Sequence, residues 1–215
     1  MTALVWLGAR RAIRLRATTN PLANPTLIAV AVVGGLVLLS GVGARAYADG
    51  TAGLSWFLGP AVVALAVPLH QERARLRRHA RALAGGAVVG AACSALVGYG
   101  LVRLVGLPSP FELALTTRSA TTPISVALAN GLGGVPALSA VASIFTGLVG
   151  ATIGPAWLPR LGVRDPVARG VAMGVCCHGI GTERLLRESR GAGATSSVGM
   201  GLGGLLVALV IPLVW

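Results

Sequence analysis

Charged residues are scarce in this sequence of 215 residues. They make up 11% of the chain, whereas 54% of the residues are hydrophobic and the mean hydropathy is +0.80. About 20 apolar residues suffice for a membrane-spanning helix, and charge is absent from residues 17–44, 50–71, 82–102, 119–159 and 191–215. This shortage excludes a soluble enzyme and a disordered chain. It predicts an all-α, polytopic integral membrane protein with about five to seven hydrophobic segments.

Cysteine is also scarce, since the chain has three. Three cysteines exclude a disulfide-stapled secreted module. Cys176 and Cys177 directly precede His178. These three residues lack the spacing and the fourth ligand of a structural zinc site. Neighbours in the sequence also point apart, so neither cysteine forms a nucleophile–base pair with His178. The 31 glycines form no phosphate-binding loop, because no Gly-Lys-Ser/Thr follows them. The sequence therefore predicts no metal, no cofactor and no enzyme.

Basic residues outnumber acidic ones by 18 to 6, and every basic residue is arginine. The arginines gather at residues 10–16 and 73–81, and basic clusters between apolar segments are typical of cytoplasmic loops. The predicted partner is therefore the lipid bilayer with its anionic headgroups, and not nucleic acid. Spans at residues 26–42 and 54–69 would place both clusters in the cytoplasm and a loop at residues 47–51 outside.

The start of the chain has the reverse order of a secretory signal, because apolar residues 1–8 precede the first arginine cluster. We interpret residues 1–23 as either a short surface-lying segment or a truncated first helix, followed by a cytoplasmic basic segment. The remainder is predicted to form, with them, a single membrane domain, residues 1–215. Its first half is residues 24–107 and its second half residues 108–215.

Proline and glycine interrupt the apolar segments that follow the second arginine cluster. Full spans are predicted at residues 83–105, 137–158 and 197–215, and shorter pieces at residues 123–129 and 170–182. Broken helices are tolerated at membrane depth only where protein or water surrounds the free backbone groups. Two dipeptides of the first half, Asn24-Pro25 and Gly59-Pro60, are echoed by Thr122-Pro123 and Gly154-Pro155. Such an echo indicates two structural repeats with broken helices, as in repeat-built transporters.

A cation and three hydroxyls precede a predicted helix start at Pro123. Arg118 and Ser119 are followed by Thr121 and Thr122. A helix N-terminus has free N–H groups and partial positive charge, so these residues suit a carboxylate. The alternative is an ordinary cap, in which a threonine hydroxyl closes the first turn.

Of the three histidines in the sequence, His178 is the one that lies within a predicted membrane-embedded segment. An imidazole at membrane depth is costly unless it is paired, which makes His178 a candidate anion contact or proton relay. On one continuous helix Thr182 would share its face, with Gly174 one turn earlier, so the three are predicted to line one cavity. The alternative is a core histidine bonded to a neighbouring helix.

Seven motifs occur in an order that resembles the LrgB/CidB family, over about residue 24 to the C-terminus. They are LGPAVVALAVPL (58–69), SATTPI (119–124), GGVPAL (133–138), GP (154–155), DPVARG (165–170), HGIGT (178–182) and SS (196–197). The chain departs from the family at Arg118, where lysine is usual, and at Gly179, where alanine is common. The family also has a complete helix before the Asn-Pro motif.

The resemblance implies a multi-pass protein of the bacterial inner membrane, described as antiholin-like or holin-like and associated with murein hydrolase control. Its usual partner is a small LrgA/CidA-type membrane protein. A plastid relative translocates glycolate and glycerate, and bacterial relatives have been linked to pyruvate and other small organic acids. The resemblance also adds Ser196 and Ser197 to the predicted substrate-binding residues, which are otherwise Arg118, Ser119, Thr121, Thr122, Pro123, His178 and Thr182.

Two classes of function therefore compete. A transporter of small carboxylates of the pyruvate or glycolate type is favoured, because broken apolar segments that carry hydroxyls, Arg118 and His178 suit anion binding at the midplane. The alternative is a holin- or antiholin-like regulator of murein hydrolase activity and lysis. The glycine-rich helix faces also leave a homo-oligomer open.

Overall fold

The computed structural model describes residues 2–16, 25–57, 60, 63–64 and 66–215. These residues form helices, with no strand among them, so the predicted all-α membrane fold is confirmed. The chain divides into two compact units, Met1–Ala66 and Val67–Trp215, and each is described by itself. The predicted division into halves at residue 108 stays a prediction.

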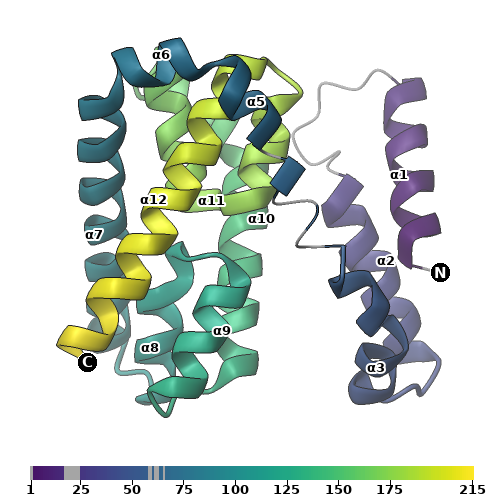
Figure 1. The fold of residues 1–215 in the computed structure, drawn as a ribbon. Coiled ribbons are helices and arrows are strands. Elements are labelled where there is room, and N and C mark those ends of the chain that lie inside the picture. The colour runs from purple at the N-terminus through teal and green to yellow at the C-terminus, as the bar shows by residue number, and fades with distance from the viewer. Residues whose placement is uncertain (1, 17–24, 58–59, 61–62, 65) are drawn as a thin grey trace. The chain divides into compact units, whose positions relative to one another are not determined.

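The first unit contains helices α1 (Thr2–Arg16), α2 (Pro25–Leu39) and α3 (Ala44–Ser55) (Figure 1). α1 packs against α2, and it continues through the first arginine cluster instead of ending before it. α2 ends at Leu39, and the turn that follows places Gly41 at a φ of 68°. With 15 residues, or about 22 Å, α2 is shorter than a bilayer core of about 30 Å.

Two sequence predictions concern the stretch after α2. The loop predicted at residues 47–51 is wrong, because these residues lie inside α3. The span predicted at residues 54–69 includes residues 58, 59, 61, 62 and 65, which lie outside the described residues, as do Asn24 and Gly59 of the dipeptide echo.

The second unit carries the long helices. Within the described residues, three helices are long and apolar enough to cross a membrane: α7 (Ala80–Val105), α10 (Pro136–Arg160) and α12 (Arg190–Val214). Each covers a span predicted from the sequence. The shorter elements are α5 (Ala66–Gln71), α6 (Arg73–Arg78), α8 (Pro110–Thr116), η1 (Thr117–Ser119), α9 (Thr122–Gly131) and α11 (Pro166–Leu186).

α8, η1 and α9 form a first hairpin that enters the second unit and turns back. α8 runs antiparallel to the end of α7, because Arg103 pairs with Glu112 at 3.5 Å and Gly98 lies against the backbone of Leu115. The ten residues of α9 span about 15 Å, which is half of a bilayer core. In Figure 1, α8 and α9 accordingly occupy the half of this unit that lies away from α6. The tip of the first hairpin, η1, therefore lies at about mid-depth.

α11 forms a second hairpin, because the chain reverses at His178. That residue has φ 49° and ψ −136° between two helical limbs. Arg169 and Glu188 are 3.0 Å apart, whereas residues separated by 19 positions on one straight helix would be about 28 Å apart. The sequence predicted residues 170–182 as one short piece, and the reversal inside it is a finding of the structure. The prediction that Gly174, His178 and Thr182 share one helix face is wrong, since Gly174 and Thr182 belong to different limbs.

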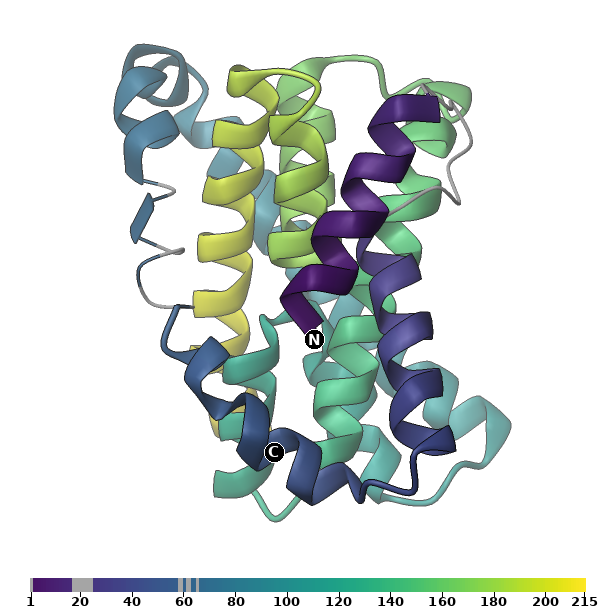
Figure 2. The same cartoon turned by 90° about the vertical axis from the view of Figure 1, so that its right-hand side faces the viewer.

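The two hairpins enter the second unit from opposite ends. The first follows the end of α7, whereas Val171 and Val175 of the second lie against Gly86 and Gly90 near the start of α7. Figure 2 shows α11 beside the first half of α12. Residues 80–131 and residues 136–186 thus form two consecutive segments of the second unit. Each consists of a long helix followed by a hairpin, and the two segments run in opposite directions. This is the arrangement of an inverted repeat.

Arginine marks one end of this unit. Of the thirteen arginines in residues 67–215, eleven lie at the end where α7 and α12 begin and α10 finishes. They are Arg73, Arg75, Arg77, Arg78, Arg81, Arg160, Arg164, Arg169, Arg184, Arg187 and Arg190. By the positive-inside rule, this end is expected to be cytoplasmic.

Cysteine labelling in intact cells tests this orientation. In a variant with Cys93, Cys176 and Cys177 replaced by serine, we expect a membrane-impermeant maleimide to label Ser109→Cys from outside. Ala74→Cys, in α6, should react only after permeabilisation, because the basic end remains inside. The parent variant without cysteine is the control, and labelling of Ala74→Cys in intact cells would show the opposite orientation.

Candidate functional site

The tips of the two hairpins touch. The Nε2 atom of His178 lies 2.8 Å from the backbone carbonyl oxygen of Arg118 and donates a hydrogen bond to it, because a carbonyl only accepts. His178 is 6% exposed, and α7, α10, α11 and α12 all pack against η1. The contact thus lies in the interior of the second unit, at the depth where both hairpins turn.

The backbone of His178 is strained. Its φ of 49° falls in a region that L-residues rarely adopt, and the other positive φ angles in the described residues belong to glycines. Such a conformation costs of order 1–3 kcal/mol and persists where the surroundings demand it. Here the reversal of α11 and the bond to the Arg118 carbonyl both depend on it.

Arg118 brings an unpaired positive charge to this point. Its side chain is half-buried, and its Nε atom is buried without a hydrogen-bond partner in the described part of the chain. None of the ion pairs formed by the described acidic residues includes Arg118. A charge withdrawn from water without a counter-ion is costly, so this arrangement favours an anion beside the guanidinium.

The start of α9 adds further donors to the same place. Thr121 is its N-cap, Thr122 its first residue and Pro123 its second. The cap alternative requires a side-chain hydrogen bond, and the structure shows none at this cap among the residues it describes. Ser119 is buried, and its hydroxyl also lacks a partner there. The threonine hydroxyls at this helix start therefore form no cap with its backbone N–H groups.

The remaining predicted residues bond to other parts of the protein. The hydroxyls of Thr182 and Ser196 are 2.9 Å apart, which joins the second limb of α11 to α12. Ser197 donates to the carbonyl of Gly193 at 3.0 Å. In the described residues no hydrogen bond links these three side chains to Arg118 or His178. A role for them in substrate binding stays a prediction.

Two serines of α10 were not predicted as site residues. Ser139 and Ser143 are fully buried, and neither hydroxyl has a hydrogen-bond partner within the described ranges. The signal available in the sequence was a pair of serines four residues apart in an apolar span. Their burial became visible only in the fold, in which α10 packs against α8, η1, α9 and α11.

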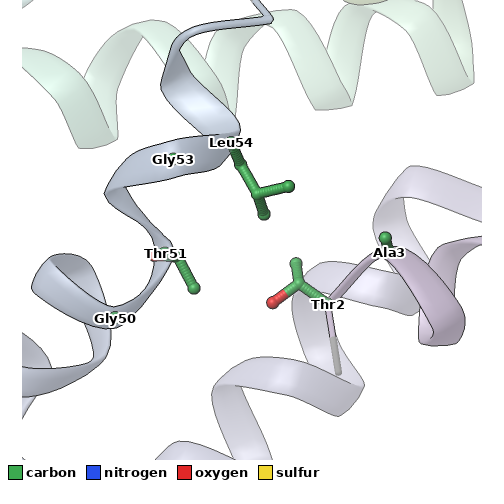
Figure 3. Close-up of a pocket in the computed structure, with 6 residues that line it drawn as sticks. All are labelled: Thr2, Ala3, Gly50, Thr51, Gly53 and Leu54. Carbon is green, nitrogen blue, oxygen red and sulfur yellow. The ribbon is translucent and has the colours of Figure 1, made fainter.

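A separate pocket of about 350 Å³ lies in the first unit, between the start of α1 and the second half of α3 (Figure 3). It is lined by Thr2, Ala3, Gly50, Thr51, Gly53 and Leu54. Thr2 bonds the hydroxyl of Tyr47, and Thr51 bonds its own helix. With no charged residue in its lining, this pocket suits an anion less well than the hairpin tips.

Comparisons with known proteins agree with the motifs. The family model described as LrgB-like family matches residues 2–215. Two proteins of Bacillus subtilis (strain 168) are similar to this chain. "Uncharacterized protein YwbG" is 34% identical over 99% of this chain and 93% of its own length. "Uncharacterized protein YxaC" is 31% identical over 90% of this chain and 84% of its own length. "Antiholin-like protein LrgB" of Bacillus mycoides (strain KBAB4) is 29% identical over 87% and 83%.

No solved structure matches this chain. The family model covers nearly the whole sequence, and the relatives align over most of their own length. The predicted resemblance is thereby confirmed, and this chain is a membrane protein that belongs to the LrgB-like family.

Proposed function

We propose that this chain transports small carboxylates, of the pyruvate or glycolate type, as a multi-pass protein of the bacterial inner membrane. The observation that carries the proposal is the unpaired, half-buried Arg118 at the point where the two hairpins meet. The substrate carboxylate would accept charge-assisted hydrogen bonds from Arg118. It would also accept hydrogen bonds from the hydroxyls and backbone N–H groups of Thr121 and Thr122, at the helix start that Pro123 favours by its fixed φ.

Opposed hairpins offer a route for alternating access. Each hairpin separates the proposed site from one side of the membrane, because one enters from each end of the second unit. Movement of one hairpin at a time would open the site to one side, as in transporters built from inverted repeats. The His178 bond to the Arg118 carbonyl holds the two tips together and would have to break when either hairpin opens.

Three further residues enter the proposal from the second hairpin and α12. Thr182, Ser196 and Ser197 are proposed as additional polar contacts for the substrate. Thr182 and Ser196 now bond each other, so contact with a substrate requires them to exchange this bond.

Replacement of His178 by glycine tests the proposed role of the imidazole. Glycine adopts a φ of 49° without strain, so relief of strain should offset part of what is lost with the buried imidazole and its hydrogen bond, and we expect the His178→Gly protein to remain folded. Transport should nevertheless fall severalfold, because the bond between the tips is lost. Thermal unfolding in detergent and uptake by proteoliposomes measure the two effects. A stable variant with unchanged uptake would contradict a role for the imidazole in transport.

A second candidate function is regulation of murein hydrolase activity and lysis, as an antiholin-like protein with a small LrgA/CidA-type partner. Several relatives are named antiholin-like protein LrgB, and these names support regulation of lysis and not transport. Transport rests instead on the geometry of the hairpin tips. Both candidates treat the chain as non-enzymatic, and a homo-oligomer is compatible with each.

Proteoliposomes that contain the purified chain separate the two candidates. A carrier should show saturable uptake of labelled pyruvate, glycolate or a related acid, and uptake should decline when unlabelled acid competes. A lesion in the membrane should instead release unrelated solutes of similar size, such as glycerol, without saturation. The same assay with a co-reconstituted LrgA-type protein tests the proposed partner, which should change the rate if it acts on this chain directly.

A further inference from the structure

Several buried hydroxyls of the described residues donate to a backbone carbonyl four residues earlier in the chain. Thr152 of α10 donates to the carbonyl of Leu148 at 2.7 Å, four residues earlier. Other buried side chains that bond in the same way are Thr116, Thr117, Thr195 and Ser197. Ser139 and Ser143 of α10 depart from this pattern, since they are 0% and 1% exposed and their hydroxyls have no partner in the described residues. A buried polar group is normally satisfied, so these two require an explanation.

The position of Ser143 on α10 brings it to the hairpin tips. Residues 139, 143 and 147 share one face of this helix. On that face, a Cβ atom added to Gly147 would lie 3.3 Å from the carbonyl oxygen of Cys177, next to His178 at the second tip. α10 also packs against η1, the tip of the first hairpin. Ser143 is thus one helical turn before the residue of α10 that lies next to the second tip, and Ser139 is two turns before it.

A third unpartnered hydroxyl comes from the first tip. Ser119 follows Arg118 directly in η1, is 1% exposed and lacks a hydrogen-bond partner among the described residues. Unpartnered polar atoms are therefore found on both elements that meet here, α10 and η1. Because α10 and η1 pack together and η1 also carries the unpaired Arg118, these hydroxyls point to a ligand and not to packing alone.

We propose that Ser119, Ser139 and Ser143 form a polar subsite that binds an uncharged oxygen next to the carboxylate of the substrate. This inference rests on the proposed transport function and adds the residues that select the substrate. The subsite would favour acids with a hydroxyl or keto oxygen on carbon 2 over acids without one. A site built to hydrogen-bond such an oxygen rejects the analogue that lacks it, because its own buried groups are then left unpaired.

The chemistry of the three side chains supports an uncharged oxygen. A serine hydroxyl both donates and accepts, so it can serve a keto oxygen as donor and a hydroxyl in either role. A metal cation is disfavoured by the positive charge of Arg118. The carboxylate itself would use Arg118 and the start of α9, which leaves the serines for the second oxygen.

Uptake of matched acids by proteoliposomes tests the subsite. Glycolate is compared with acetate, and lactate with propionate, since each pair differs in one hydroxyl. For the parent protein, the half-saturation concentration should be lower for the hydroxylated acid. In Ser143→Ala it should rise about three- to tenfold for glycolate and lactate, with no change for acetate and propionate. Ser139→Ala should act in the same direction, and Thr152→Val, which removes a back-bonded hydroxyl of the same helix, should leave the preference unchanged.

Thermal stability without substrate provides an independent readout. Ser143→Ala removes a buried hydroxyl that has no partner, so its unfolding temperature should be equal to or above that of the parent. A lower unfolding temperature together with reduced uptake of all four acids would overturn the proposal in favour of a packing role. If Ser143→Ala is poorly produced, Ser143→Cys, which keeps the size but only a weak donor, should give the same loss of preference.

Three other outcomes also decide the matter. Equal half-saturation of the parent for both acids of a pair would overturn the subsite and leave the transport function standing. A preference that persists in both serine variants would overturn it as well, and would assign the hydroxyls to bound water. Absence of saturable uptake for all four acids would overturn the transport function, and the subsite with it.

Discussion

Replacing Gly98 by alanine should unfold or strongly destabilise the second unit, by about 3 kcal/mol or more. A methyl group at this position would collide with the carbonyl oxygen of Leu115 and would lie 2.7 Å from its carbonyl carbon. Both are backbone atoms of α8, which cannot move aside as a flexible side chain does. The first hairpin would have to leave α7, and η1 would be displaced with it. Unfolding of the detergent-solubilised protein, followed by size-exclusion chromatography after heating, measures the loss.

Gly100 provides the matched control on the same helix. A Cβ atom there would meet nothing within 4 Å in the described structure, so Gly100→Ala should be neutral or slightly stabilising, as alanine favours the helix over glycine by about 1 kcal/mol. Gly174→Ala makes the equivalent test of the second hairpin, because its Cβ would collide with the Ser196 carbonyl of α12. Equal stability of Gly98→Ala and Gly100→Ala would show that α8 does not pack on α7 as described.

Replacing Arg118 by alanine should raise the half-saturation concentration for the transported carboxylate about 10- to 100-fold. Charge-assisted hydrogen bonds contribute roughly 1.5–3 kcal/mol each, which corresponds to this range. Arg118→Lys should keep part of the affinity, because it retains the charge without the planar fork of donors. Thr122→Ala should have a smaller effect in the same direction. Initial rates of uptake over a range of acid concentrations measure all three.

Arg103 is the control for a loss of charge that is remote from the site. Its guanidinium pairs with Glu112 at the far end of α7, and 64% of its side chain is exposed. Arg103→Ala should therefore leave the half-saturation concentration unchanged. Normal uptake by Arg118→Ala, at normal abundance in the membrane, would mean that the carboxylate binds elsewhere and that the start of α9 is an ordinary helix start.

The sequence alone was sufficient to predict an all-helical membrane protein. It also predicted the positions of most of the long helices. Long charge-free runs bounded by arginine predict spans, because burial of charge in a bilayer is prohibitive. α7, α10 and α12 follow these runs closely. The Thr121, Thr122 and Pro123 group likewise predicted a helix start, since proline is suited to the first turn and threonine to the position before it. Seven motifs in order were enough to indicate the family.

The arrangement of the broken segments could be seen only in the folded protein. Periodicity treats residues 170–182 as one helix, so it placed Gly174 and Thr182 on the same face as His178. The reversal at His178 instead depends on packing of both limbs of α11 against α12 and on a bond to Arg118, sixty residues earlier. Ser139 and Ser143 read as ordinary residues of an apolar span for the same reason. Their burial depends on the elements that pack around α10, and contacts between such distant segments leave no periodic pattern in the chain.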